Sequence, residues 1–123
     1  MDAENRPNQS NSDKALRVIF AGTPEFAVPS LSHIARSRHR VVLVLTQPDR
    51  PSGRGLKFVA SPVKQAANEL GVRVEQPQTL KDPLVVSLLQ SVSADIMIVA
   101  AYGLILPQAI LDVPRLGALN VHA

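Results

Sequence analysis

The fold is decided by residues 16–35, which read LRVIFAGTPEFAVPSLSHIA. The opening run, LRVIFAG, is short, rich in apolar residues and closed by a glycine, which is typical of a buried strand. Apolar residues then recur at helical spacing, at Ala27, Leu31 and Ile34. Thr23 is predicted to cap the helix that they form, and Pro24 suits its first position. A buried strand therefore passes directly into a helix.

The same alternation continues along the rest of the chain. Further strands are predicted at residues 40–47, 72–77, 95–103 and 117–123. Ser61 and Asp82, each followed by proline, open two more helices, and Gly71 ends the first of these. Continuously apolar strands between helices indicate an α/β fold, a doubly wound Rossmann-like parallel sheet. Right-handed crossovers give the expected strand order third, second, first, fourth, fifth.

The composition limits the chemistry that the chain can perform. Of its 123 residues 46% are hydrophobic and 3% aromatic, and the formal charge is +3, so one domain with an aliphatic core is expected. The absence of Cys excludes disulfides, thiolate metal sites and cysteine nucleophiles. No pair of histidines or carboxylates has metal-ligand spacing, so no metal is predicted. His33 and His39 are expected at the surface.

The two ends of the chain differ in character. Residues 1–14 are polar and lack the apolar segment of a signal peptide, so a flexible tail is expected before a domain at residues 15–123. The apolar runs are far shorter than the roughly 20 residues of a membrane span. A cytoplasmic location and no membrane partner are the resulting expectations.

Ligands of such a sheet bind beyond the carboxyl ends of its strands, near the switch point. After the first strand the chain reads GTPEFA, with Gly22 as its sole glycine, where a dinucleotide site would read G-x-G-x-x-G. A nicotinamide or flavin site is therefore disfavoured, and Gly22 is interpreted as a packing or turn residue.

Two polar side chains mark the end of the fifth strand. Asn120 and His122 are two residues apart, so strand alternation places them on one face and Val121 on the other. An amide donor suits a developing oxyanion, and a histidine can move a proton near neutral pH. The alternative is a structural pair, with the His bonded to backbone and the Asn in a turn.

The segment from Gln47 to Pro62 is rich in Pro and Gly and is expected to be an irregular loop. Between Thr46 and Lys64 the basic residues are Arg50, Arg54, Lys57 and Lys64, and the acid is Asp49. Such side chains can hold phosphates, although a solvated loop is the common role of a charged run. A structureless loop of this length in a compact domain is uncommon and often functional.

Five runs together resemble the methionyl-tRNA formyltransferase family. They are LRVIFAGTPEFAVPSL, TQPDRPSGRG, SPVKQAA, ADIMIVAAYGLILPQAIL and PRLGALNVHA. N-x-H alone marks the wider formyltetrahydrofolate-dependent superfamily, and the TQPDRPSGRG loop points to the tRNA enzymes within it. The resemblance implies formyl transfer from 10-formyltetrahydrofolate to the α-amine of initiator methionyl-tRNA, in the bacterial cytosol or an organelle matrix, by an enzyme that is monomeric at full length.

The resemblance also implies roles for individual residues. Asn120 and His122 match the catalytic pair. The apolar wall for the folate ring is implied at Tyr102, Gly103, Leu104, Ile105, Leu106 and Pro107. The tRNA contacts are implied at Arg50, Arg54 and Lys57. Phe26 is implied, more distantly, in the aminoacyl pocket.

The resemblance ends at the fifth strand, where family members continue into a catalytic Asp, further folate contacts and a C-terminal barrel. The sheet is thus expected to be truncated after its fifth strand, and the 123-residue chain alone to be inactive or nearly so. Asp95 and Asp112 cannot replace the missing Asp, because Asp95 begins the fourth strand, at the wrong end of the sheet, and Asp112 precedes the fifth strand. The alternatives are a glycinamide ribonucleotide or amino-sugar formyltransferase, or a weak RNA-binding Rossmann-like module.

Overall fold

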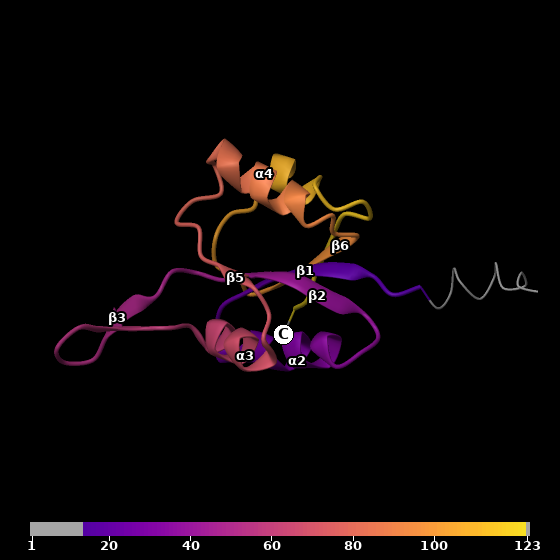
Figure 1. The fold of residues 1–123 in the computed structure, drawn as a ribbon. Coiled ribbons are helices and arrows are strands. Elements are labelled where there is room, and N and C mark those ends of the chain that lie inside the picture. The colour runs from indigo at the N-terminus through magenta and orange to yellow at the C-terminus, as the bar shows by residue number, and fades with distance from the viewer. Residues whose placement is uncertain (1–13, 123) are drawn as a thin grey trace, which may run out of the picture.

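The computed structural model describes residues 14–122 and contains one five-stranded sheet (Figure 1). Its strands are β1 (Arg17–Gly22), β2 (Arg40–Leu45), β5 (Val74–Glu75), β6 (Ile96–Ala100) and β7 (Ala118–Asn120). Their order is β5-β2-β1-β6-β7, and every neighbouring pair is parallel. The predicted α/β fold and strand order are confirmed.

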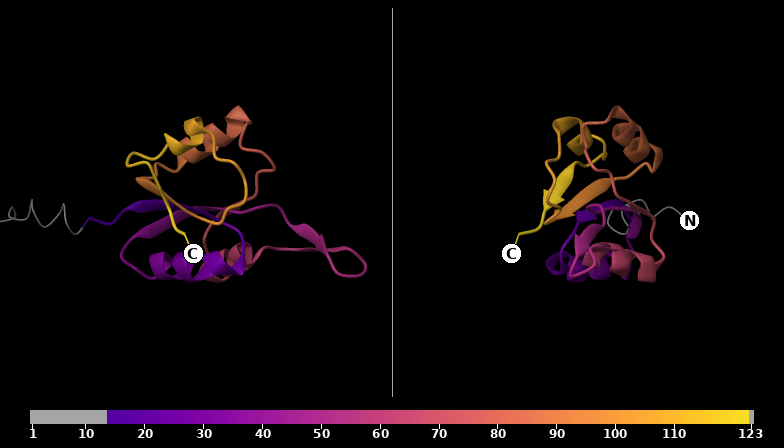
Figure 2. Two further views of the ribbon diagram at one scale, coloured as in Figure 1. Left: turned by 180° about the vertical axis from the view of Figure 1, so that it is seen from behind. Right: turned by 90° about the vertical axis from the view of Figure 1, so that its left-hand side faces the viewer.

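Helices cover both faces of this sheet (Figures 1 and 2). The 3-10 turn η1 (Glu25–Ala27), α2 (Val28–Ala35) and α3 (Pro62–Leu70) lie on one face, and α4 (Pro83–Ser91) and α5 (Gln108–Leu111) on the other. Strand alternation divides the core accordingly. Phe20 packs with Leu31 of α2 on the first face, and Ile19 packs with Leu89 of α4 on the second.

Helix ends follow the local chemistry of the sequence at three of the predicted positions. The Ser61 hydroxyl accepts from the Lys64 amide at the start of α3 (3.0 Å), and the Asp82 carboxylate accepts from the Leu84 amide at the start of α4 (2.9 Å). Gly71 ends α3 with φ of 73°, a left-handed conformation that favours glycine. These predictions are confirmed.

Thr23 does not cap a helix, and that prediction is wrong. The turn that follows begins with Pro24 as the N-cap of η1, without a side-chain cap. The Thr23 hydroxyl instead donates to the Tyr102 carbonyl (2.7 Å) and accepts from the Gln47 amide (3.3 Å). The threonine therefore joins the ends of three segments of the sheet instead of starting a helix.

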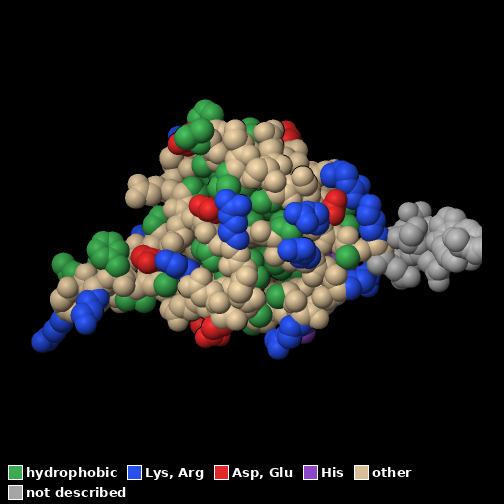
Figure 3. Space-filling view, in the orientation of Figure 1, with side chains coloured by type: hydrophobic (Ala, Val, Ile, Leu, Met, Phe, Trp, Pro, Cys, Tyr) green, Lys and Arg blue, Asp and Glu red, His purple; other side chains and the backbone are tan. Residues whose placement is uncertain are grey.

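The basic segment after β2 is a hairpin, so the expected irregular loop is wrong for its middle part. Strands β3 (Arg50–Ser52) and β4 (Lys57–Val59) pair antiparallel, and the glycines at 53 and 55 take positive φ values in the turn. The hairpin projects from the body of the protein, where Figure 3 shows basic and hydrophobic side chains near its end. Phe58 is 70% exposed.

Some expectations fall outside the described part or need adjustment. The predicted tail lies outside the described residues except for Lys14. His33 is exposed as predicted, but His39 is half-buried and its Nδ1 accepts from the Leu16 amide (2.9 Å). No helix within residues 14–122 is long and apolar enough to cross a membrane.

Candidate active site

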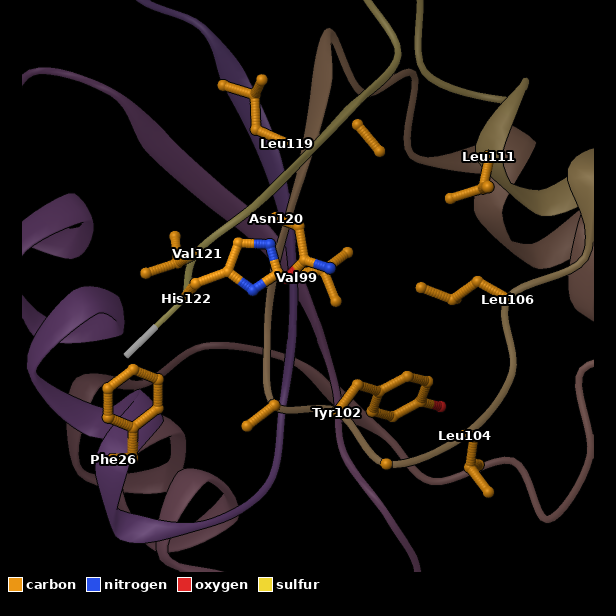
Figure 4. Close-up of a pocket in the computed structure, with 13 residues that line it drawn as sticks. Phe26, Val99, Tyr102, Leu104, Leu106, Leu111, Leu119, Asn120, Val121 and His122 are labelled. Atoms are coloured by element: carbon orange, nitrogen blue, oxygen red, sulfur yellow. The ribbon is translucent and has the colours of Figure 1, made fainter.

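A cavity of about 730 Å³ opens beyond the ends of β6 and β7 (Figure 4). It is lined by Phe26, Val99, Ala101, Tyr102, Gly103, Leu104, Leu106, Leu111, Ala118, Leu119, Asn120, Val121 and His122. The volume lies in the range of small-molecule sites, which are mostly apolar with a few polar groups. The cavity is at the carboxyl edge next to the switch point, where doubly wound sheets bind ligands.

The structure brings Asn120 and His122 to this one cavity, and both side chains are exposed there (Figure 4). Strand β7 is shorter than expected and ends at Asn120, so His122 lies just beyond it. The Val121 amide still donates to the Val99 carbonyl (2.7 Å), which extends the ladder by one bond and holds the chain between the two polar residues. An amide donor and an imidazole thus border one apolar space.

The predicted apolar wall is only partly placed against the cavity. Tyr102, Gly103, Leu104 and Leu106 line it. Ile105 is 88% exposed and does not line the cavity, and neither does Pro107. The wall turns sharply, because Ala101 has φ of 53° and Gly103 has φ of 91° on the two sides of Tyr102.

Tyr102 is the most deeply buried polar side chain of the wall. It is 2% exposed, and burial raises the pKa of its phenol to about 12. The phenol is therefore neutral at physiological pH. Its hydroxyl has no hydrogen-bond partner within residues 14–122. Tyr102 is thus a neutral lining residue, and its backbone carbonyl accepts from Thr23 and Gln47.

Phe26 borders the same cavity from the first βα connection. It is 44% exposed and lies in η1, just past the end of β1 (Figure 4). Gly22, which precedes this turn, has no room for a side chain. A Cβ there would lie 2.8 Å from the Ala100 carbonyl and 2.9 Å from the Ala27 Cβ. The interpretation of Gly22 as a packing residue is confirmed.

The structure separates the three predicted RNA-binding cations from Asn120 and His122. Arg50, Arg54 and Lys57 lie on the hairpin, are exposed, and do not line the large cavity. Arg50 lines a smaller neighbouring cavity of about 260 Å³, and Leu104 lines both cavities. The wall that contains Leu104 thus stands between the two candidate binding regions.

Sequence reasoning missed the polar network at the base of the hairpin. Asp49 accepts from Lys64 Nζ (3.1 Å to each oxygen) and from Gln76 Nε2 (2.7 Å). Both hydrogen bonds lower the pKa of the Asp49 carboxyl, and the bond from Gln76 has a larger effect than the bond from Lys64. The signal was available, because Gln47 and Gln76 lie at the carboxyl ends of the second and third predicted strands, at the same edge as the site.

Asp95 and Asp112 do not line the cavity, in agreement with their places in the sequence. Asp95, before β6, accepts from the Arg17 amide (2.8 Å) and from the Arg115 guanidinium (3.1 Å) at the opposite edge of the sheet. The Arg17 bond is the main cause of its lowered pKa. Asp112 ends α5, where it accepts from Gln108. Within the described residues no group of three or more His, Cys, Asp and Glu side chains is placed to hold a metal ion.

The fold is one that formyl transferases have. The family model with the description "Formyl transferase" matches residues 15–123, and the chain belongs to that family. Among solved structures, glycinamide ribonucleotide transformylase 1 from Symbiobacterium toebii is 16% identical with a TM-score of 0.58. The match covers 88% of this chain and 51% of the transformylase chain. At this sequence identity the likeness shows the fold alone.

The curated relatives with higher sequence identity are methionyl-tRNA formyltransferases. The methionyl-tRNA formyltransferase of Thiobacillus denitrificans is 61% identical over 108 residues, which are 88% of this chain and 35% of that protein. The methionyl-tRNA formyltransferase of Chromohalobacter salexigens is 59% identical over 109 residues, 89% of this chain and 34% of that protein. The chain thus spans about a third of the length of the curated relatives it matches.

Proposed function

We propose that this chain supplies the catalytic Asn and His, part of the folate wall and the tRNA-contacting hairpin of a methionyl-tRNA formyltransferase. The observation that carries the proposal is that Asn120 and His122 share one cavity with an apolar wall formed by residues 101–104 and Leu106. The names of the relatives support methionyl-tRNA as the acceptor. The donor, 10-formyltetrahydrofolate, is the one that the resemblance of the motifs implies. We expect a monomer that acts in the bacterial cytosol or an organelle matrix.

The two polar residues divide the chemistry. The folate supplies an activated formyl group, whose bond to the folate nitrogen breaks as a bond to the methionyl α-amine forms. Asn120 donates its amide N–H to the formyl oxygen as that oxygen gains negative charge, an interaction stronger in the transition state than before it. His122 accepts the proton that the attacking amine loses and passes it toward the departing nitrogen.

The hairpin holds the polynucleotide in this proposal. Arg54 and Lys57 are exposed near the turn and are free to approach phosphates, whereas the Arg50 guanidinium already donates to Gln47. Arg54→Ala is therefore expected to raise the KM for methionyl-tRNA and to reduce its salt dependence, with little change in kcat. The KM for the folate should stay the same, since Arg54 does not line the large cavity.

The test uses a chimera in which residues 15–123 replace the matching third of the Thiobacillus denitrificans relative. Asn120→Ala and His122→Ala should each lower kcat/KM for methionyl-tRNA by about 100-fold or more. Asn68→Ala and His33→Ala are matched controls on exposed helix surfaces, and they should retain activity. Both cavity variants retaining near-normal activity would contradict the proposed roles. Activity on an amino-sugar or glycinamide ribonucleotide, with none on methionyl-tRNA, would contradict the substrate.

A further inference from the structure

Gln47 connects the basic hairpin to the wall of the large cavity. It lies after β2 at the carboxyl edge of the sheet, shortly before β3 begins at Arg50. Its Nε2 donates to the Tyr102 carbonyl (3.0 Å), and its Oε1 accepts from the Arg50 guanidinium. The two ends of one side-chain amide are therefore used on two different parts of the site.

The backbone of Gln47 is also held on both sides. Its amide donates to the Thr23 hydroxyl (3.3 Å), and its carbonyl accepts from Gln76 Nε2 (3.2 Å). The same Gln76 nitrogen donates to Asp49, at the base of the hairpin (2.7 Å). These bonds hold the backbone of Gln47 on both sides, so its side chain is the part of the residue that is left to respond to a change at Arg50.

The wall at Tyr102 is shaped around the Gln47 side chain. A Cβ on Gly103 would collide with Gln47 Nε2, so the amide occupies the space that a side chain at 103 would need. Ala101 and Gly103 both have positive φ, a conformation that glycine adopts readily but that alanine keeps only where its surroundings enforce it. The Tyr102 carbonyl between them accepts from Thr23 and from Gln47, and these are the bonds that hold the turn.

We propose that Gln47 is a positioning residue that couples the hairpin to the cavity wall. An anionic group that takes Arg50 removes one of the two side-chain partners of Gln47, and the wall at Tyr102 and Leu104 loosens in response. The identity of the two ligands, a tRNA phosphate and a folate, rests on the proposed function. The coupling is a property of the chain and is measured without either ligand.

The composition of the chain supplies a direct probe. It has a single tyrosine and no tryptophan, so tyrosine emission of the 123-residue chain reports on Tyr102 alone. Acrylamide quenching of this emission measures access to the wall. Trypsin cleavage after Arg54 and Lys57 measures exposure of the hairpin, and the bond after Arg50 is protected by Pro51. Quenching therefore reports on the contact of Gln47 with Tyr102, and trypsin cleavage reports on its contact with Arg50.

The test compares Gln47→Met, Arg50→Met and the double variant with the wild-type chain. Each single change should raise the quenching constant by about fivefold, the population change that corresponds to the loss of one ordinary hydrogen bond. The double variant should show no further increase, because the effect of Arg50 passes through Gln47. Gln78→Met is the matched control, since Gln78 lines the smaller cavity and is not bonded to Tyr102.

Gln47→Glu distinguishes the two contacts and serves if Gln47→Met does not fold. It keeps an oxygen for Arg50 and replaces the donor to Tyr102, so quenching should rise while hairpin cleavage stays at the wild-type rate. Unchanged quenching in the folded Gln47 variants, or an additive double variant, would overturn the proposal. Neither result would alter formyl transfer by the chimera, so failure of the coupling and failure of the proposed function can be distinguished.

Discussion

Replacement of Gly103 by Ala measures how closely the hairpin base approaches the cavity wall. Gly103 has φ of 91°, and an added Cβ would collide with the Gln47 side-chain amide. Gly117, just before β7, has a similar φ of 83° but has nothing within 4 Å of an added Cβ. The two substitutions therefore share the backbone strain and differ in the neighbour.

The expected magnitudes follow from these two contributions. A left-handed alanine costs about 1–2 kcal/mol relative to its ordinary conformation, and this applies to Gly103→Ala and Gly117→Ala alike. At Gly103 the Gln47 amide must also leave the Tyr102 carbonyl, and an ordinary hydrogen bond contributes about 1 kcal/mol. Gly103→Ala should thus lower the free energy of unfolding by about 2–3 kcal/mol, roughly 1 kcal/mol more than Gly117→Ala.

Urea unfolding of the 123-residue chain, followed by far-UV circular dichroism, measures both variants. The same pair is then made in a Gln47→Ala background, where the added methyl group at 103 has no amide to displace. The difference between Gly103→Ala and Gly117→Ala should disappear in that background. Equal losses in the wild-type background, or a difference that survives removal of Gln47, would refute the assigned contact.

Two further predictions concern other polar contacts. Asp95→Asn should lower the free energy of unfolding by about 1 kcal/mol at pH 7, since it removes the charge that accepts from the Arg17 amide. The pKa of Asp95 is lowered from 3.8 in the folded state, so this contribution to stability is fully present above pH 3.8 and is lost as pH falls through the folded-state pKa. The urea midpoints of the variant and the wild type should therefore converge at acidic pH, below that folded-state pKa. Ser61→Ala should lower the free energy of unfolding by about 1 kcal/mol, measured by heat or urea, because it removes the cap of α3 and the partner of the buried Thr46 hydroxyl (2.7 Å). Ser61→Thr keeps a hydroxyl and should retain most of this stability. Full stability of Ser61→Ala would contradict the capping role.

The sheet could be predicted because the sequence patterns that mark its strands and helices are local. Buried strands such as β1 and β6 are short apolar runs, and their flanking helices carry caps and stops at Ser61, Gly71 and Asp82. The parallel order then follows from handedness and from the single switch point. The convergence of Asn120 with the wall at Tyr102 also followed, since strand ends share one edge.

The hairpin and the polar network were not predictable in the same way. The strands β3 and β4 are short, exposed and interrupted by Pro51, so they lack the apolar alternation by which a strand is read from sequence. The bonds of Gln47 to Tyr102 and of Asp49 to Gln76 join residues far apart in the chain. Local patterns cannot specify which distant polar groups will meet.

The error at Thr23 explains how the wall is held. A threonine before a proline-led turn is normally a good helix cap, because its hydroxyl can accept from a free amide. Here the hydroxyl is used as a donor to the Tyr102 carbonyl, and η1 begins without a side-chain cap.

The Thr23 hydroxyl therefore supports the edge of the sheet and does not cap the helical turn. The Tyr102 carbonyl lies between two residues of positive φ and accepts two hydrogen bonds from outside its own segment. Thr23, at the end of β1, and Gln47, after β2, supply both. The wall that faces Asn120 and His122 is therefore held by the two strands that precede it in the chain, and one of these leads directly into the hairpin.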